Sequence, residues 1–159
     1  MPSGYPNLLR AKDITQKECS FSHPWNPASE ITYTHISREA GLTRSGVSLM
    51  RVPPGKESMA YHLHHLEEEW IYILSGRALA LIDGGEYEMG PGDFVGFPTP
   101  SVAHNLANPF GEELVYLSGG EHHEHEIADF PELGKRMVRI GEEMTIYDLA
   151  DGQAMFDDD

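Results

Sequence analysis

From residue 31 onward, short segments rich in β-branched and aromatic residues recur at intervals of roughly 8–12 positions, with glycine, proline and aspartate between them. The strand candidates are ITYTHIS (31–37), SGVSLMRV (45–52), EWIYILSG (69–76), RALALID (77–83), EYEMGPGD (86–93), FVGFPTP (94–100), SVAHNLANP (101–109), ELVYLSGG (113–120) and EEMTIYDL (142–149). The segment Asp83-Gly84-Gly85 is a strong tight-turn signal. No helical period appears between residues 45 and 120. The pattern predicts an all-β domain, either a sandwich or a barrel.

The length of 159 residues fits one domain. Residues 1–30 contain four prolines and little periodicity, so we expect an N-terminal arm with one short element near NLLRAKDI (7–14). We assign residues 31–150 to a single domain whose core motifs lie at 45–120, with a short helix or turn near ADFPELGKR (128–136). Residues 151–159, which end in FDDD, are interpreted as a solvated acidic tail.

The formal net charge of −15, with only 11 basic residues, argues against two classes of partner. Nucleic acids and anionic membranes are bound mainly through lysine and arginine, and this chain has no basic cluster. The single cysteine, Cys19, excludes an intrachain disulfide framework and fits a reducing compartment. The N-terminus lacks an apolar core of signal-peptide length, and no run approaches the ~18 apolar residues of a membrane span. We therefore expect a cytoplasmic protein.

Histidine and glutamate are concentrated in YHLHHLEEEW (61–70), directly before a predicted strand. His62 and His64 are two residues apart, so a strand would place both imidazoles on one face. Glu69 has the wrong parity for the same strand, but a turn through HLEE would let the next strand direct it into the same space. His104 begins a later strand candidate behind a proline-containing turn. Three imidazoles and one carboxylate suit Mn, Fe, Ni, Cu or Zn better than Ca or Mg, although solvated strands also carry His-x-His pairs.

The stretch from Gly55 to Gly76 resembles the first signature of the cupin superfamily, G-x5-H-x-H-x3,4-E-x6-G, with six residues instead of five after the first glycine. Its positions here are Gly55, His62, His64, Glu69 and Gly76. The second signature, G-x5-P-x-G-x2-H-x3-N, is approximated by Gly92, Pro98, His104 and Asn108. Pro100 stands where a glycine is expected, and one extra residue precedes His104.

The resemblance implies a double-stranded β-helix, a cupin jelly-roll barrel, with an N-terminal arm and a short C-terminal extension. It implies one divalent transition metal (Mn, Fe, Ni or Zn) held by His62, His64, Glu69 and His104, a small-molecule substrate or ligand, and a homodimer. Residues 107–130, ANPFGEELVYLSGGEHHEHEIADF, also resemble the corresponding stretch of cupin-type mannose-phosphate isomerases.

Several residues near these candidate ligands have more than one structural or functional interpretation. His65 could replace His64 as a ligand, but it lies on the opposite face of the strand. Glu67 and Glu68 are interpreted as exposed turn carboxylates, with contact to a ligand imidazole as the alternative. Asn108 is expected to brace a turn. The remaining candidates are Trp70, Tyr72 and Leu74 as core or dimer-interface residues, EHHEHE (121–126) as a polar loop with a second metal site as the alternative, and His23 and His35 as structural or solvated residues.

Four protein ligands leave two positions on an octahedral metal, which suits a substrate with neighbouring oxygens. One hypothesis is an isomerase of a sugar or sugar phosphate, with Glu69 as the catalytic carboxylate. Phosphate recognition needs bases, and the nearest in sequence, Arg51, Lys56 and Arg77, are interpreted as surface charges. The alternatives are a cupin dioxygenase or decarboxylase, and a non-catalytic cupin that binds a metal or a small molecule.

Overall fold

The computed structural model describes residues 4–155, so the FDDD sequence at the end of the predicted tail lies outside the described residues. Short helical elements are α1 (Ala11–Gln16), α2 (Ile36–Glu39) and the 3-10 turns η1 (Pro131–Leu133) and η2 (Leu149–Asp151). The strands are β1 (Cys19–Phe21), β2 (Ile31–Thr34), β3 (Ser45–Val52), β4 (Lys56–Glu57), β5 (Leu63–His64), β6 (Glu69–Ser75), β7 (Ala78–Ile82), β8 (Gly85–Met89), β9 (Phe94–Phe97), β10 (His104–Asn108), β11 (Leu114–Glu121), β12 (His125–Phe130), β13 (Lys135–Ile140) and β14 (Glu143–Asp148). No described helix is long and apolar enough to cross a membrane.

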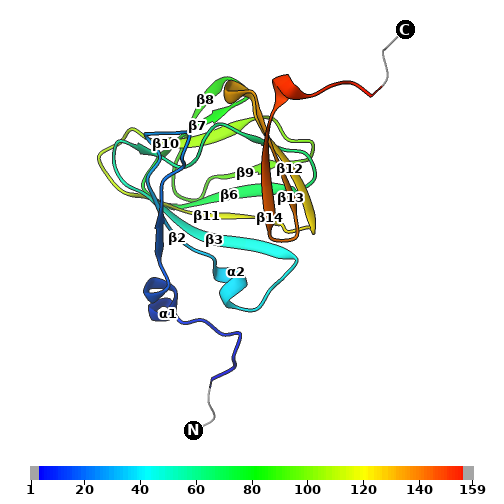
Figure 1. Cartoon of the computed structure of the whole chain (residues 1–159). Coiled ribbons are helices and arrows are strands. Elements are labelled where there is room, and N and C mark those ends of the chain that lie inside the picture. The colour runs from blue at the N-terminus through cyan, green and yellow to red at the C-terminus, as the bar shows by residue number, and fades with distance from the viewer. Residues whose placement is uncertain (1–3, 156–159) are drawn as a thin grey trace.

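The strands form one six-stranded sheet, in the order β1-β2-β3-β11-β6-β9, and two four-stranded sheets, β4-β10-β7-β8 and β14-β13-β12-β5. Neighbouring strands within these sheets run antiparallel. Strands far apart in sequence lie side by side, as β11 does between β3 and β6. Figure 1 shows these sheets surrounding one interior, with α1 and α2 outside it. The all-β jelly-roll prediction is confirmed.

Each strand candidate between residues 45 and 120 contains a strand, and the described structure has no helix there. Two local predictions need correction. The second half of ITYTHIS turns into α2, so β2 ends at Thr34. EHHEHE is not entirely a loop, because its last two residues begin β12, whose burial alternates from Glu126 onward. The strand was not predicted from the sequence because its first buried residue is a glutamate, which is normally exposed to solvent. The segment near ADFPELGKR does contain a short turn, η1, between β12 and β13.

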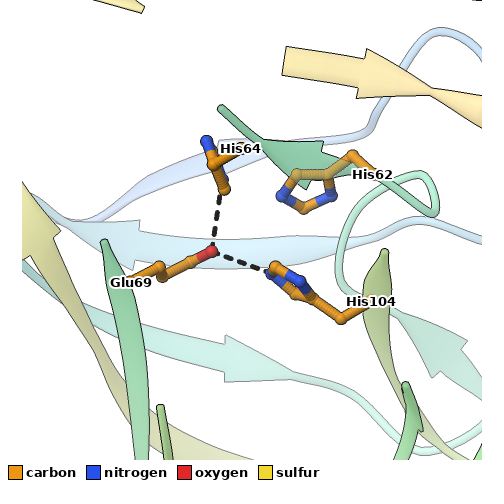
Figure 2. A group of neighbouring side chains, drawn as sticks. All are labelled: His62, His64, Glu69 and His104. Atoms are coloured by element: carbon orange, nitrogen blue, oxygen red, sulfur yellow. Dashed lines mark hydrogen bonds and ion pairs between the residues drawn. The ribbon is translucent and has the colours of Figure 1, made fainter. Parts of the chain in front are cut away.

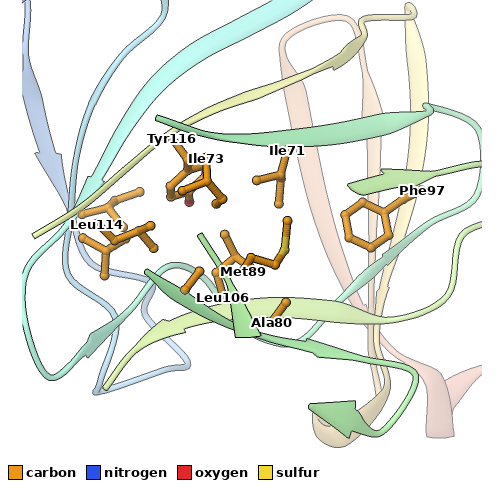
Figure 3. Close-up of a cluster of buried hydrophobic side chains, with 11 residues drawn as sticks. Ile71, Ile73, Ala80, Met89, Phe97, Leu106, Leu114 and Tyr116 are labelled. Atoms are coloured by element: carbon orange, nitrogen blue, oxygen red, sulfur yellow. The ribbon is translucent and has the colours of Figure 1, made fainter. Parts of the chain in front are cut away.

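The hydrophobic core fills one end of the barrel (Figure 3). Its buried members are Ile31, Val52, Ile71, Ile73, Ala78, Ala80, Met89, Phe97, Leu106, Leu114 and Tyr116.

Along β3 and β11 the inward-facing pairs change from large to small. Leu114 pairs with Val52 and Tyr116 with Met50, whereas Ser118 pairs with Ser48 and Gly120 with Gly46. Large apolar side chains close the first end, and the small pairs leave space at the other end. The candidate site lies at that second, open end.

On β6 the alternation places Ile71 and Ile73 inside and Tyr72 and Leu74 outside. Tyr72 and Leu74 are 38% and 42% exposed, so neither belongs to the core. Trp70 stacks on Phe94 of β9, with ring centroids 5.9 Å apart. The core interpretation of these residues is therefore wrong for Tyr72 and Leu74. Their place in a dimer interface stays a prediction.

Candidate metal centre

Four predicted ligands converge at the open end of the barrel: His62, His64, Glu69 and His104 (Figure 2). One nitrogen or oxygen from each lies within 4.8 Å of those of the others. The rings of His62 and His104 are 4.8 Å apart between centroids, and those of His62 and His64 are 5.0 Å apart. Within residues 4–155, no other set of at least three His, Cys, Asp and Glu side chains gathers in this way.

Local backbone structure explains how residues distant in sequence meet here. His62 and His104 form an antiparallel bridge, with backbone N–H to carbonyl distances of 3.1 and 2.8 Å. His64 ends β5 and Glu69 begins β6, so the intervening turn resets the side-chain parity as predicted. The backbone of His64 is also held by Ser101, whose hydroxyl accepts its N–H at 2.8 Å.

Two of the imidazoles have a backbone carbonyl on the ring nitrogen that faces away from the centre. Nδ1 of His62 lies 2.7 Å from the oxygen of Ala60, and Nδ1 of His104 lies 3.1 Å from that of Val102. A carbonyl oxygen only accepts, so each Nδ1 carries the proton and, in the neutral ring, Nε2 keeps its lone pair. Metal-binding histidines are typically oriented by such outer hydrogen bonds. The residues therefore fit a transition metal.

Burial strengthens this fit for His62. Loss of hydration lowers the pKa of its imidazole to about 4, so the ring is neutral near pH 7. A neutral ring is the form that binds a metal.

The Glu69 carboxylate lies between two of the histidines. Its Oε2 is 2.9 Å from Nε2 of His104 and 3.2 Å from Nε2 of His64, and its Oε1 accepts the hydroxyl of Ser118 at 3.1 Å. Burial alone would raise the pKa of the Glu69 carboxyl, but hydrogen bonding to His104 and His64 outweighs it and holds the pKa well below its ordinary value. The carboxylate is therefore ionised, as a metal ligand must be.

Aromatic side chains cover the site from within the barrel. Phe97 lies flat against the ring of His104, with centroids 3.7 Å apart and planes 9° apart. Phe130 lies beside His62 at 6.0 Å. These contacts restrict rotation of the two imidazoles and keep water away from that side.

The opposite side opens into a pocket of about 780 Å³. Its floor includes His64, Glu69 and Ser118, and its walls come from β3, β11, α2 and the β13–β14 hairpin. Arg38 and Arg139 are the arginines that line it. The volume suits a small polar molecule that reaches the four-residue centre.

Other sequence candidates lie outside this centre. Nε2 of His65 is 2.8 Å from Asp129 on the neighbouring strand, so His65 does not replace His64. Asn108 braces a turn as predicted, because its side chain bonds to the backbone of Phe110 and Glu112. His23 is buried and structural, and His35 is exposed and bonded to Ser48. Arg51, Lys56 and Arg77 pair with acidic side chains and do not line the pocket.

Two carboxylates differ from their sequence interpretation. Glu67 is not an exposed turn residue, because its side chain is 13% exposed and pairs with Arg139. Glu126 is not part of a polar loop, because it is 1% exposed and accepts backbone N–H groups from the turn after His64. Both contacts join segments far apart in sequence. The single local signal for Glu126 was the apolar alternation that follows it.

Comparison with known proteins identifies the family of this chain. Residues 48–120 match the family model of the cupin domain. A protein from Acidithiobacillus ferrooxidans, described as a candidate sugar phosphate isomerase, is 36% identical to this chain, with a TM-score of 0.88. The alignment covers 96% of this chain and 98% of that protein. No match is found among curated proteins.

Two more distant structures share the fold. A sugar phosphate isomerase of the cupin superfamily from Silicibacter pomeroyi is 21% identical, with 87% and 89% of the two chains covered and a TM-score of 0.77. A protein from Thermotoga maritima described as a predicted oxalate decarboxylase is 20% identical, with 73% and 99% covered and a TM-score of 0.60. By its fold, its domain match and its full-length similarity, this chain belongs to the cupin superfamily.

Proposed function

We propose that the protein is a metal-dependent isomerase that interconverts the aldose and ketose forms of a sugar or sugar phosphate. One observation carries the proposal: His62, His64, Glu69 and His104 converge on one point, and two of them, His64 and Glu69, line a pocket large enough for such a molecule. The similarity along nearly the whole chain to a protein described as a candidate sugar phosphate isomerase supports it.

The proposed cofactor is one divalent Mn, Fe, Ni or Zn ion, held by the three Nε2 atoms and the carboxylate of Glu69. Such an ion supplies Lewis-acid stabilisation of negative charge on the carbonyl and neighbouring hydroxyl oxygens of the substrate. The protein orients the ligands through Ala60, Val102 and Ser118.

Glu69 is also the proposed catalytic carboxylate, and its surroundings restrict that role. Both of its oxygens are engaged, Oε2 with the histidines and Oε1 with Ser118. A carboxylate with a strongly lowered pKa is a weak base, so proton transfer to Oε1 of Glu69 should become easier when the hydrogen bond from Ser118 is removed. Replacing Ser118 by alanine tests this step, because it frees Oε1 without removing a metal ligand.

Of the two arginines that line the pocket, one is accessible to a phosphate. Arg139 is engaged with Glu67 and His122, whereas Arg38 is exposed and lies 3.8 Å from Glu142 across the pocket mouth. If the substrate is phosphorylated, Arg38→Ala should raise KM for the phosphorylated sugar and leave KM for the free sugar unchanged. Equal effects on both sugars would count against a phosphate contact at Arg38.

The direct test is to measure metal content in tag-free protein and then incubate the loaded protein with aldoses, ketoses and their phosphates in D2O. Proton NMR should show conversion with deuterium entering at the carbon next to the carbonyl. Oxygen-dependent consumption of substrate would favour a dioxygenase, release of CO2 a decarboxylase, and binding without turnover a non-catalytic cupin. Each of these outcomes would replace the isomerase proposal.

We also propose that the protein is a cytoplasmic homodimer whose interface includes the outer face of β6 and β9. Tyr72, Leu74 and Phe94 are exposed there by 38%, 42% and 62%. Light scattering should give twice the mass of the chain, and Phe94→Glu should give the mass of one chain. A monomeric wild-type protein would contradict the proposal.

A further inference from the structure

Glu126 is a carboxylate in a place where an unpaired charge would be costly. It is 1% exposed and lies on β12, on the sheet that also contains β5 and His64. No arginine or lysine is paired with it among the described residues. A buried carboxylate needs hydrogen bonds from its surroundings, so its partners show what it does.

Those partners are backbone amides of the turn that joins two metal-ligand positions. Oε1 accepts the N–H of His65 at 3.1 Å and lies 3.4 Å from that of Leu66, and Oε2 accepts the N–H of Glu67 at 2.7 Å. The turn begins after His64 and ends before Glu69. Glu126 therefore fixes the path by which the chain passes from one proposed ligand to the next.

The same carboxylate faces the third imidazole of the centre. Nδ1 of His64 is a fully buried nitrogen without a hydrogen-bond partner in residues 4–155, and Oε1 of Glu126 lies 3.6 Å from it. Nδ1 of His62 and of His104 each have an oxygen acceptor. A small rotation of His64 toward Glu126 would give it the equivalent bond.

We propose that Glu126 is the positioning residue for His64: it holds the 65–67 turn by its amides and accepts the Nδ1 proton of His64, leaving Nε2 for the metal. The inference rests on the proposed metal site and not on the isomerase reaction. It assigns the same tautomer to all three histidines, two through backbone carbonyls and the third through a carboxylate. A carboxylate acceptor also increases the basicity of the imidazole it bonds to.

The test compares Glu126→Gln with Glu121→Gln in the full-length protein. Glutamine retains the shape and one acceptor oxygen but not the charge. Glu121 is a matched control because its carboxylate accepts the N–H of Glu68, in the same turn, yet its side chain is 45% exposed. Zn²⁺ affinity, measured by competition with a chromophoric chelator, should fall about 10–100-fold in Glu126→Gln and remain within about 2-fold of wild type in Glu121→Gln.

A second measurement needs no variant. Nitrogen-15 NMR of the histidine rings in Zn²⁺-loaded wild-type protein should show His64 protonated at Nδ1 and bound through Nε2. The opposite tautomer, or wild-type affinity in folded Glu126→Gln, would overturn the proposal. Lower thermal stability of Glu126→Gln with unchanged affinity would also overturn it, because the role would then be structural only. If wild-type protein binds no metal while Glu126→Gln folds normally, the proposed metal site has failed instead.

Discussion

Nε2 of His104 lies 2.9 Å from Oε2 of Glu69, although the other nitrogen of the same ring already donates to a backbone carbonyl. A neutral imidazole has one N–H, so this ring cannot donate to both oxygens. A metal ion held by both atoms would take the place of the proton that a hydrogen bond between them requires. Proton and metal therefore compete for the same position, and the predictions for this site follow from that competition.

Removing one ligand should abolish stoichiometric metal. His62→Ala and His104→Ala leave three donors, and we expect elemental analysis to find one ion per wild-type chain and almost none in either variant. Metal that binds only the folded state at 100 times its Kd adds ~2.7 kcal/mol to the free energy of unfolding. For a chain of this size that free energy corresponds to a Tm difference of ~5–10 °C. A chelator should therefore lower the Tm of the wild type by this amount and leave the Tm of both variants unchanged.

His65→Ala is the matched control for these variants. It removes a neighbouring imidazole that bonds to Asp129 outside the centre. We expect wild-type metal content in this variant. Equal metal content in wild type, His104→Ala and His65→Ala would contradict the ligand assignment.

Metal binding should release protons. Burial by itself lowers the pKa of His64, but its bond to Glu69 and the charges of Glu69 and Glu126 raise the pKa above its ordinary value. A metal must displace that proton, so affinity should decrease as pH falls through the raised pKa. Calorimetry in buffers of different ionisation enthalpy should give a buffer-dependent binding enthalpy near neutral pH. A buffer-independent enthalpy would contradict this prediction.

The same pKa shifts determine how the stability of the metal-free protein changes with pH. A raised pKa in His64 contributes stability below its unfolded pKa, and that contribution is lost as pH rises through the folded value. The lowered pKa of Glu69 contributes stability above its unfolded pKa, which is lost as pH falls through the folded value. Denaturant unfolding of the protein after removal of metal with a chelator should therefore show that His64 and Glu69 together contribute most to the free energy of unfolding in mildly acidic solution.

The fold, and three of the four side chains that converge in the candidate metal centre, could be predicted because their signals are local. Alternation within EWIYILSG directs Ile71 and Ile73 inward, and the spacing of His62 and His64 places two imidazoles on one face. Turn residues mark the strand ends. His104 was a candidate from its place at the start of a predicted strand, but nothing local to it specifies its partners, and the cupin signature was needed to group it with His62 and His64.

The supporting residues could not be predicted, because their partners are distant in the sequence. Glu126 contacts the amides of His65 and Glu67, and Arg139 contacts Glu67. Burial of an unpaired charge is unfavourable, so a charged residue is interpreted from the sequence as exposed to solvent unless its partners are known. Small residues such as Ser118 give an equally weak signal.

Asn108→Ala should lower stability without affecting the metal. The side chain is 1% exposed, and its amide donates to the carbonyl oxygens of Val52 at 2.9 Å and Glu112 at 2.8 Å. Alanine leaves these acceptors unpaired, which costs ~1–3 kcal/mol in the free energy of unfolding. The exposed Asn7→Ala is the control and should unfold like wild type. Urea denaturation measures both, and a loss of metal from folded Asn108→Ala would contradict the separation of this turn from the centre.

Gly120→Ala should disturb the metal centre through the backbone. A Cβ at Gly120 would lie 2.3 Å from the carbonyl oxygen of Glu68 and 3.2 Å from Cα of Glu69, so the start of β6 must move. We expect ~1–3 kcal/mol lower stability, as for overpacking in a core. Because Glu69 is a proposed ligand, Zn²⁺ affinity should fall as well.

Gly46→Ala tests whether this effect arises from the clash or from lost space. Gly46 is paired with Gly120 across β3 and β11 and lines the same pocket, but a Cβ there would meet only the carbonyl oxygen of Gly120, at an ordinary 3.6 Å. We expect Gly46→Ala to retain wild-type stability and Zn²⁺ affinity, measured by denaturation and chelator competition. If the two alanine variants lose affinity equally, pocket volume and not displacement of Glu69 controls metal binding.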